Sequence, residues 1–269
     1  MNKKLSLLLC ILTSFLLIPQ TVFAESEQIL ITISEHMDQV IFDGKWSFSN
    51  TETTEWKFSS YDVFRYEDGN KIVLRSAHQG EFIYFLIDFV TDQNIDSGLD
   101  KAVICFDTEN NKSQRADEND YCFLAILDGK TFFSYQGGSS LVTQSNFKKI
   151  PNHSDAIVIG TSSDNNDRYS KIPHSSYEFK IPTDLIGRKN VYGFYLGVYD
   201  HNTNKLYTWP PNIYTETKFR IDDPVTWGEL VSPDKSLPEF EFPFLALFSS
   251  LILILIMTRM KNRVYTQNA

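Results

Sequence analysis

The stretch VYGFYLGVYD, residues Val191–Asp200, contains the clearest structural pattern in this sequence of 269 residues. Successive side chains of a β-strand point to opposite faces of a sheet, and this stretch gives each face its own character. The first face holds Val191, Gly193, Tyr195, Gly197 and Tyr199, and the second holds Phe194, Leu196 and Val198. The alternation predicts a β-strand with a large hydrophobic residue at seven of its ten positions.

Similar aromatic and β-branched runs recur along the chain between clusters of Asn, Asp, Gly and Ser. They predict strands at residues 29–33, 72–76, 82–89, 101–107, 121–127, 130–135, 156–161, 176–181, 192–200 and 217–221. Asp128-Gly129 indicates a two-residue hairpin turn, and residues 183–186 indicate one helical turn. We therefore expect an all-β fold, an antiparallel β-sandwich of jelly-roll type, over residues 25–231.

The N-terminal 24 residues have the pattern of a secretory signal peptide. Lys3 and Lys4 precede an apolar run at residues 5–18, and a polar segment starts at Glu25. The alternative is a retained membrane anchor, but the apolar run is shorter than the roughly 20 residues that a spanning helix needs. We expect an exported protein.

Residues 242–258 contain no charged side chain and match the shortest apolar helices that span a membrane. Arg259, Lys261 and Arg263 follow them, and basic flanks stay in the cytoplasm. The alternative is a buried helical hairpin of a soluble domain. We predict a short stalk at residues 232–241, a single transmembrane helix at 242–258 and a cytoplasmic tail at 259–269, with the ectodomain outside the cell membrane.

Pro238, Glu239 and Phe240 precede this apolar run, and the whole segment resembles the C-terminal anchoring segments of archaeal surface proteins. Glu241 departs from that pattern, because a small or apolar residue is more usual there. The resemblance implies retention at the cell surface.

The charge of the exported part limits its partners. Between Glu25 and Glu241 lie 34 acidic and 20 basic residues, a net charge of −14. Such a surface repels phosphates, so we expect no nucleic acid partner. Cys105 and Cys122 flank a polar loop, and an oxidising compartment favours a disulfide between them. Two buried free thiols are the alternative.

Several motifs, in order, resemble the family 9 carbohydrate-binding modules and the related DOMON-like β-sandwiches. They are Ile41-Phe-Asp-Gly44 followed by Trp56, Val103-Ile-Cys-Phe-Asp107 followed by Asp120-Tyr121, Tyr177-Glu-Phe-Lys-Ile-Pro182, and residues 192–200 followed by Trp209-Pro210. The resemblance implies a β-sandwich, a bound calcium ion in many members, and a sugar or haem ligand according to the branch.

Aromatic rings with polar neighbours are what a sugar site needs. The candidates for ligand binding are Trp46, Tyr135, Tyr195, Tyr199, Tyr207 and Trp209. Each also has an alternative interpretation as a core residue, because the tyrosines alternate along strands and the tryptophans lie near turns or strand ends.

The acidic loop after residue 106 is the candidate calcium site. Asp107, Asp117 and Asp120 offer the carboxylate oxygens that calcium prefers. A solvated acidic loop is the alternative. Asn111 and Asn152 begin glycosylation sequons, and a glycan on Asn111 would argue against a metal in this loop.

Catalytic motifs are absent from the sequence. No H-E-x-x-H, G-x-S-x-G or Gly-rich phosphate loop occurs, although 34 carboxylates leave room for a glycosidase pair. Haem would depend on an axial pair such as Met37 with His36, and no C-x-x-C-H occurs. We therefore expect a non-catalytic module that binds an extracellular glycan or another envelope component. The alternatives are a structural envelope protein without a small-molecule site and a haem-binding electron-transfer domain.

Overall fold

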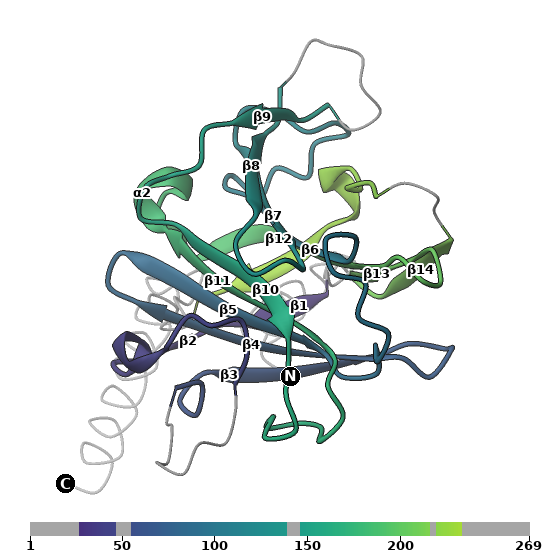
Figure 1. Cartoon of the computed structure of the whole chain (residues 1–269). Helices are drawn as coiled ribbons and strands as arrows, with labels where there is room; N and C mark the ends of the chain where they lie inside the picture. The colour runs from purple at the N-terminus through teal and green to yellow at the C-terminus, as the bar shows by residue number, and fades with distance from the viewer. Residues whose placement is uncertain (1–26, 47–54, 139–145, 216–218, 233–269) are drawn as a thin grey trace, which may run out of the picture.

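The stretch Val191–Asp200 forms strand β12, in the interior of the larger of two β-sheets (Figure 1). This computed structural model describes residues 27–46, 55–138, 146–215 and 219–232. β12 pairs with β6 along one side and with β13 and β15 along the other. One face of β12 packs in the core between the sheets and the other lies in a second hydrophobic cluster, which explains why its sequence has almost no polar position.

The larger sheet, sheet A, has nine strands in the described chain, in the order β1-β15-β12-β6-β7-β8-β9, with β13 on β12 and β14 on β13. Its strands are β1 (Gln28–Leu30), β6 (Lys101–Asp107), β7 (Asp120–Ile126), β8 (Phe132–Gln136), β9 (Lys148–Ile150), β12 (Val191–Asp200), β13 (Lys205–Trp209), β14 (Asn212–Thr215) and β15 (Gly228–Val231).

The smaller sheet, sheet B, has six strands in the order β10-β11-β5-β4-β2, with β3 also on β4. They are β2 (Thr32–Ile33), β3 (Ser60–Arg65), β4 (Lys71–Gln79), β5 (Phe82–Phe89), β10 (Ile157–Ser162) and β11 (Ser175–Pro182). In the described ranges the helical elements are α2 (Thr183–Ile186) and two short 3₁₀ turns, η1 (Met37–Gln39) and η2 (Pro224–Thr226). The predicted helical turn at 183–186 is confirmed.

The inner faces of the two sheets pack together and form the main core. Phe85 of β5 stacks on Phe194 of β12, with ring centroids 5.3 Å apart, and Phe89 meets Tyr207 of β13 at 5.0 Å. These contacts join sheet B to sheet A, as the facing layers of a sandwich require. The all-β sandwich expected from the sequence is therefore the observed architecture.

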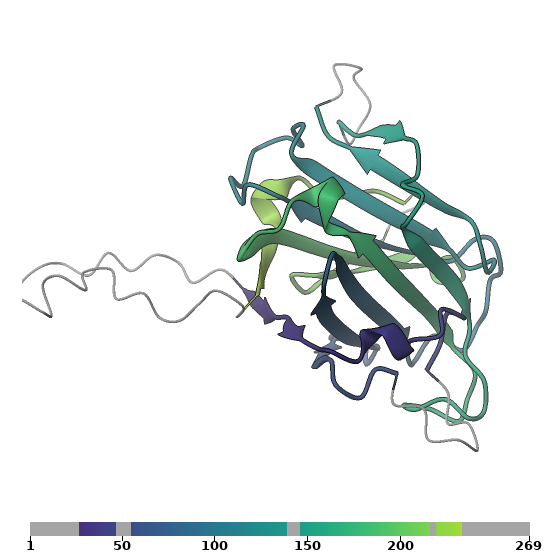
Figure 2. The same cartoon turned by 90° about the vertical axis from the view of Figure 1, so that its left-hand side faces the viewer.

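The pairing is mixed rather than purely antiparallel. The predicted strand 29–33 is two strands, because the chain leaves sheet A after Leu30 and enters sheet B at Thr32. β1 runs parallel to β15, and β2 runs parallel to β4. One segment thus contributes an edge to each sheet, and β1 and β2 lie along one side of the sandwich (Figure 2).

Other strand predictions need correction. Asp128-Gly129 lies in a five-residue connection from β7 to β8, in which the Asp128 carboxylate accepts the N–H groups of Lys130 and Thr131. Residues 219–221 are not a strand. The sequence reading missed β3, β9, β13, β14 and β15, which are short or carry polar residues.

The outer face of sheet B is covered by the N-terminal segment. Glu178 of β11, which is fully buried, accepts the backbone N–H of Gly44 at 2.6 Å and the indole N–H of Trp56 at 2.9 Å. Gly44 has a φ of +91°, and a Cβ there would lie 2.4 Å from Thr161 Cγ2. The Asp-Gly turn and Trp56 are thus held by one carboxylate of the opposite half of the chain.

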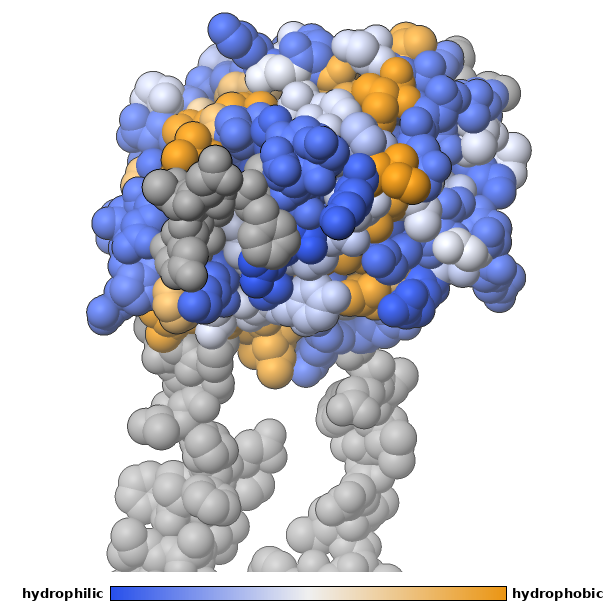
Figure 3. All heavy atoms as spheres, turned by 60° about the horizontal axis from the view of Figure 1, so that its bottom comes forward, coloured by the Kyte–Doolittle hydropathy of each residue, from blue (hydrophilic) through white to orange (hydrophobic). Residues whose placement is uncertain are grey.

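The surface seen when the bottom of Figure 1 comes forward is mostly hydrophilic, with small separate hydrophobic areas (Figure 3). The predicted signal peptide, the anchor at 242–258, its Pro-Glu-Phe motif and the tail lie outside the described residues, as does the predicted stalk beyond Ser232. Within the described ranges, no helix is long and apolar enough to cross a membrane.

Candidate functional site

Trp46 packs on the outer face of sheet B and is only 2 % exposed. The guanidinium groups of Arg75 and Arg168 lie 5.3 Å and 4.9 Å from its ring centroid. Cations over an aromatic face contribute to stability, and the 2 % exposure leaves little of this ring open to a ligand. The structure therefore places Trp46 in a buried cluster, and ligand binding by Trp46 stays a prediction.

Tyr207 and Trp209 face the main core from β13, and both are buried. The Tyr207 hydroxyl donates to Asp68, and the Trp209 ring packs against Phe64 and Phe194. Both rings therefore pack in the main core, and ligand binding by either residue stays a prediction.

The outer face of sheet A carries the remaining candidates. Tyr195, Cys105, Cys122 and Tyr135 are neighbours in one row across β12, β6, β7 and β8. Tyr199 is buried on the same face, where Phe219 packs edge-on against it. Tyr135 is half-buried. Binding by Tyr135 stays a prediction.

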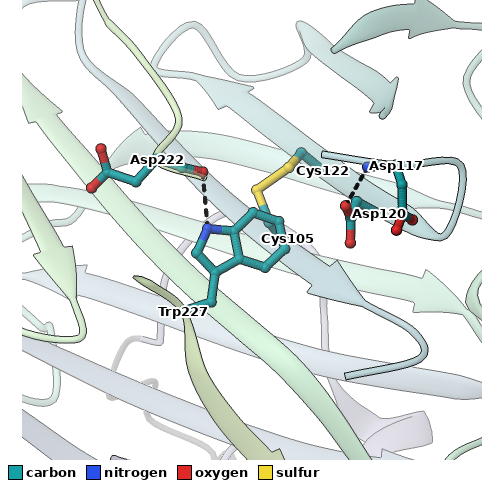
Figure 4. Close-up of a disulfide and its surroundings, with 6 residues drawn as sticks. All are labelled: Cys105, Asp117, Asp120, Cys122, Asp222 and Trp227. Carbon is teal, nitrogen blue, oxygen red and sulfur yellow. Dashed lines mark hydrogen bonds between the residues drawn. A yellow bond between two sulfur atoms is a disulfide. The ribbon is translucent and has the colours of Figure 1, made fainter. Parts of the chain in front are cut away.

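A disulfide joins Cys105 to Cys122 in the middle of this outer face, as the sequence predicted. The Trp227 indole lies beside it and donates its N–H to the backbone carbonyl of Asp222 at 3.0 Å (Figure 4). Trp227 also stacks on Tyr195, with ring centroids 5.9 Å apart. The disulfide and Trp227 thus form a second, smaller core that fixes the position of Tyr195.

A pocket of about 200 Å³ opens on the outer face of sheet A next to this second core. We call it the β13–β14 pocket. The residues that line it are Tyr195, Thr208, Pro210, Pro211, Asn212, Tyr214, Asp222 and Thr226. β12, β13 and β14 supply the floor and one wall, and the segment before β15 supplies the other wall. Two tyrosines, two threonines, an amide and a carboxylate therefore converge on one small cavity.

The pairing register explains why these residues meet. Thr208 pairs with Gly197 on one side and with Asn212 on the other, so the three share one row of the sheet. Gly197 leaves space above the strand, and the Tyr195 hydroxyl leans over it, 3.1 Å from where a Cβ would be. An alanine at position 197 would contact this hydroxyl.

The Tyr195 hydroxyl has no hydrogen-bond partner among the described residues, although the side chain is 1 % exposed. A buried polar group without a partner costs about 1–3 kcal/mol. Burial, and then the charge of Asp222, raise the pKa of Tyr195 well above its ordinary value, so the hydroxyl stays protonated. Tyr195 lines the pocket, and its hydroxyl lacks a protein partner in the described chain to donate to or accept from.

The walls add charge and a second ring. Burial, and then the charge of Asp222, also raise the pKa of Tyr214, and the Arg220 guanidinium lies 4.7 Å from the Tyr214 ring centroid. Arg220 Nε lies 3.5 Å from an Asp222 carboxylate oxygen. The pocket therefore has an aromatic wall supported by a cation and a carboxylate.

Sequence reasoning identified Tyr195 but missed most of the pocket. Asn212 and Tyr214 precede the strand predicted at 217–221, and Asp222 follows it. The missing hairpin consists of Lys205–Trp209, in which polar and apolar residues alternate, and the strand that starts at Asn212. Pro210 and Pro211 form the turn between them. Asp222 carries no local pattern, because it reaches the pocket only through tertiary structure.

The carboxylates of the predicted calcium loop accept hydrogen bonds from backbone N–H groups of the same loop. Asp107 accepts the N–H groups of Glu109 and Lys112, and Asp120 accepts that of Asp117 at 2.6 Å. Burial raises the pKa of Asp120 to about 7, with the charge of Asp107 adding to it. These carboxylates organise the loop through backbone N–H groups, and calcium at this position stays a prediction.

Two other groups in the described chain bring three metal-ligand atoms within 4.8 Å of one another. Asp88, Asp167 and His174 are buried, and His174 Nε2 lies 3.0 Å from Asp88 Oδ1. This first group forms an internal ion pair. The second group consists of the three carboxylates of Asp96, Asp100 and Asp200.

The remaining predicted site residues lie elsewhere. Asn111 and Asn152 are exposed, and the Asn152 amide bridges the backbone of Phe132 and Ser134 at the edge of β8. Glycosylation of either residue stays a prediction. Met37 is buried in the cluster that contains Trp46 and Trp56, whereas His36 packs against Phe58.

No protein-family model matches this sequence, and no curated protein matches it either. Among solved structures, the chain is similar to a family 9 carbohydrate-binding module from Caldicellulosiruptor kristjanssonii in complex with cellotriose, with a TM-score of 0.47 and 12 % identity over 77 % of this chain and 93 % of the other. The same module in complex with glucose gives 0.45 and 11 % over 77 % and 95 %. A putative carbohydrate-binding protein from Bacteroides uniformis gives 0.42 and 10 % over 77 % and 100 %.

Proposed function

We propose that this protein is a non-catalytic carbohydrate-binding module whose ligand enters the β13–β14 pocket. The observation that carries the proposal is the buried, unpartnered Tyr195 hydroxyl at the floor of a pocket with further hydroxyl, amide and carboxylate groups. A fold tolerates such a hydroxyl when a ligand completes its hydrogen bonds. A sugar offers hydroxyl groups that both donate and accept.

The size and lining of the pocket favour one sugar ring. Its volume of about 200 Å³ is below the roughly 300–1,000 Å³ of sites for drug-sized ligands. Tyr214 provides an apolar ring with a polar end, and Asn212 and Asp222 provide the directional acceptors and donors around it. We infer that a terminal or single pyranose residue is bound, with the rest of the glycan in solvent.

The number of carboxyl groups that line the pocket favours binding of a glycan over its hydrolysis. Glycoside hydrolysis generally needs two carboxyl groups that flank the bond to be broken. Among the residues that the structure describes, Asp222 is the single carboxylate that lines the pocket. The site is therefore built to hold a sugar rather than to hydrolyse a glycan.

We further propose that the module is exported and held at the cell surface. The disulfide supports an oxidising compartment, and the sequence patterns at both ends support export and anchoring. β1 and β15 run side by side, with Glu229 N–H donating to the Glu27 carbonyl. An anchor at either end would hold the sandwich by this edge.

A glycan array with the purified full chain tests the proposal. We expect saturable binding to a subset of glycans, and at least a tenfold loss in Tyr214→Ala, because the aromatic wall is removed. Phe58→Ala is the control, since Phe58 is an aromatic residue that is 45 % exposed on the other side of the sandwich. A folded protein that binds no glycan, or that loses binding equally in both variants, would contradict the proposal and favour a structural envelope protein.

A further inference from the structure

One buried cluster next to sheet B combines an imidazole with two carboxylates. Asp88 lies in β5 between two residues of the main core, so its side chain points to the outer face of the sheet. Asp167 belongs to the connection from β10 to β11, and His174 directly precedes β11. The three side chains are 0 % exposed, and one possible ligand atom of each lies within 4.8 Å of the others. Distant parts of the chain therefore meet through three groups that bind metals.

The hydrogen bonds of His174 show which ring nitrogen faces the carboxylates. Nδ1 lies 2.9 Å from the backbone carbonyl of Ile172, and a carbonyl can only accept, so Nδ1 carries a proton. Nε2 lies 3.0 Å from Asp88 Oδ1 and 3.7 Å from Asp167 Oδ1. An imidazole that binds a metal through one nitrogen commonly donates its other N–H to a backbone carbonyl in this way.

The ion pair of His174 with Asp88 satisfies only part of this cluster. A proton on Nε2 bonds to Asp88 Oδ1, but Asp88 Oδ2 and Asp167 Oδ2 are buried and have no hydrogen-bond partner among the described residues. In the described chain both aspartates form their ion pairs with this one histidine, so one negative charge is left without a partner. Such a buried charge is strongly unfavourable. A divalent cation would balance both carboxylates.

The spacing of the ligand atoms fits a small transition-metal ion. Zinc binds imidazole nitrogen and carboxylate oxygen at about 2.0–2.2 Å, so the ligands of a tetrahedral site lie about 3.3–3.6 Å from one another. The separations of 3.0 Å and 3.7 Å from His174 Nε2 lie on either side of this range. Asp167 Oδ1 also accepts the N–H groups of Tyr169 and Ser170. Outer hydrogen bonds of this kind orient carboxylates that bind metals.

The connection that carries Asp167 also borders the solvent. Residues 165–171 line a surface pocket of about 360 Å³, and Asp167 is one of them. Asp167 thus contacts both this pocket and His174. This gives an ion the entry path that a metal site needs.

We propose that Asp88, Asp167 and His174 Nε2 bind a divalent transition-metal ion of the zinc type. The imidazole nitrogen distinguishes this site from a calcium site, because calcium takes oxygen ligands. The ion would fix the β10–β11 connection to β5. The same connection donates the Arg168 N–H to the Trp46 carbonyl, so the ion would stabilise the layer that covers sheet B. It would take no part in the β13–β14 pocket, which opens on sheet A.

Zinc titration of the full chain, purified without a histidine tag and treated with chelator, tests this assignment. We expect calorimetry to show one ion bound per chain and the thermal unfolding midpoint to rise in zinc, because an ion that binds only the folded state stabilises it. Asp167→Asn should weaken binding at least tenfold, and since Asp167 lies outside the strands this variant leaves both sheets unchanged. His174→Gln should act in the same direction.

His153→Gln is the matched control. His153 Nε2 also lies beside an aspartate, 3.3 Å from Asp184 Oδ2, but this pair is partly exposed. The control should bind zinc like the unmodified chain.

X-ray absorption at the zinc edge of the unmodified protein decides the matter even if a variant does not fold, and we expect it to show one imidazole among oxygen ligands. The assignment is overturned if the folded protein binds no zinc at millimolar concentration. It is also overturned if folded Asp167→Asn and His174→Gln bind zinc as tightly as the unmodified chain, or if X-ray absorption shows no imidazole ligand.

Discussion

Single residues that join distant parts of the chain determine the outer layers of this sandwich. Glu178 illustrates this, because its buried carboxylate holds both Gly44 N–H and the Trp56 indole. Burial raises the pKa of Glu178 well above its ordinary value. The sequence showed the Asp-Gly turn and the tryptophan, but not the acid 134 positions later that holds Gly44.

Gly44→Ala should be among the most destabilising small substitutions. Gly44 has a φ of +91° and no room for a Cβ beside Thr161. Gly69 is the matched control, because its φ is +88° but nothing lies within 4 Å. We expect Gly69→Ala to lower the unfolding free energy by about 1–2 kcal/mol through the backbone alone, and Gly44→Ala to cost about 1–3 kcal/mol more. Equal losses in urea unfolding would disprove the packing argument.

His174 should make stability depend on pH. Burial alone lowers the pKa of His174, but the hydrogen bond and charge of Asp88, with Asp167 nearby, outweigh it and raise the pKa. Burial and the Asp88 charge likewise raise the pKa of Asp167. Both contributions are present in full at low pH and are lost as the pH rises through the folded pKa values.

Unfolding free energies measured from pH 5.5 to pH 8.5 check this sign. We expect stability to fall toward the alkaline end, and the fall to be smaller in His174→Asn than in the unmodified chain. An identical pH dependence in the two proteins would show that the buried ion pair does not set it.

At the scale of elements, long central strands were predictable and short edge strands were not. β5, β6, β7, β11 and β12 follow apolar runs, because both of their faces are buried. Residues 29–33 also form an apolar run, yet they divide between two sheets at Ile31. The local sequence pattern cannot show which sheet a strand joins. The two parallel pairings and the β13–β14 hairpin therefore could not be predicted.

The disulfide between β6 and β7 should stabilise the fold and the site together. The cysteines are 17 residues apart in sequence, and closing such a loop is worth about 3 kcal/mol. We expect the double variant Cys105→Ala, Cys122→Ala to lose about that much in urea unfolding. Because Trp227 packs beside the disulfide, glycan affinity should also fall, whereas loss of affinity without loss of stability would contradict this role.

At the scale of the whole molecule, aromatic residues cover both outer faces of the sandwich. Trp46 and Trp56 belong to the layer on sheet B, and Tyr195 and Trp227 to the layer on sheet A. A sequence shows that rings alternate along strands but not that loops will cover them. Most of the aromatic residues predicted to bind a ligand are therefore buried. The candidate site is formed instead by the Tyr195 hydroxyl and the β13–β14 hairpin.

Glycan affinity and stability of Tyr195→Phe, measured together, test the central claim most directly. The substitution removes only the buried hydroxyl at the floor of the pocket. We predict that affinity for the glycan found on the array falls at least tenfold, while the unfolding free energy without ligand stays equal or rises by about 1–3 kcal/mol, since an unpartnered buried group is removed. Unchanged glycan affinity in a stable Tyr195→Phe protein would contradict the account.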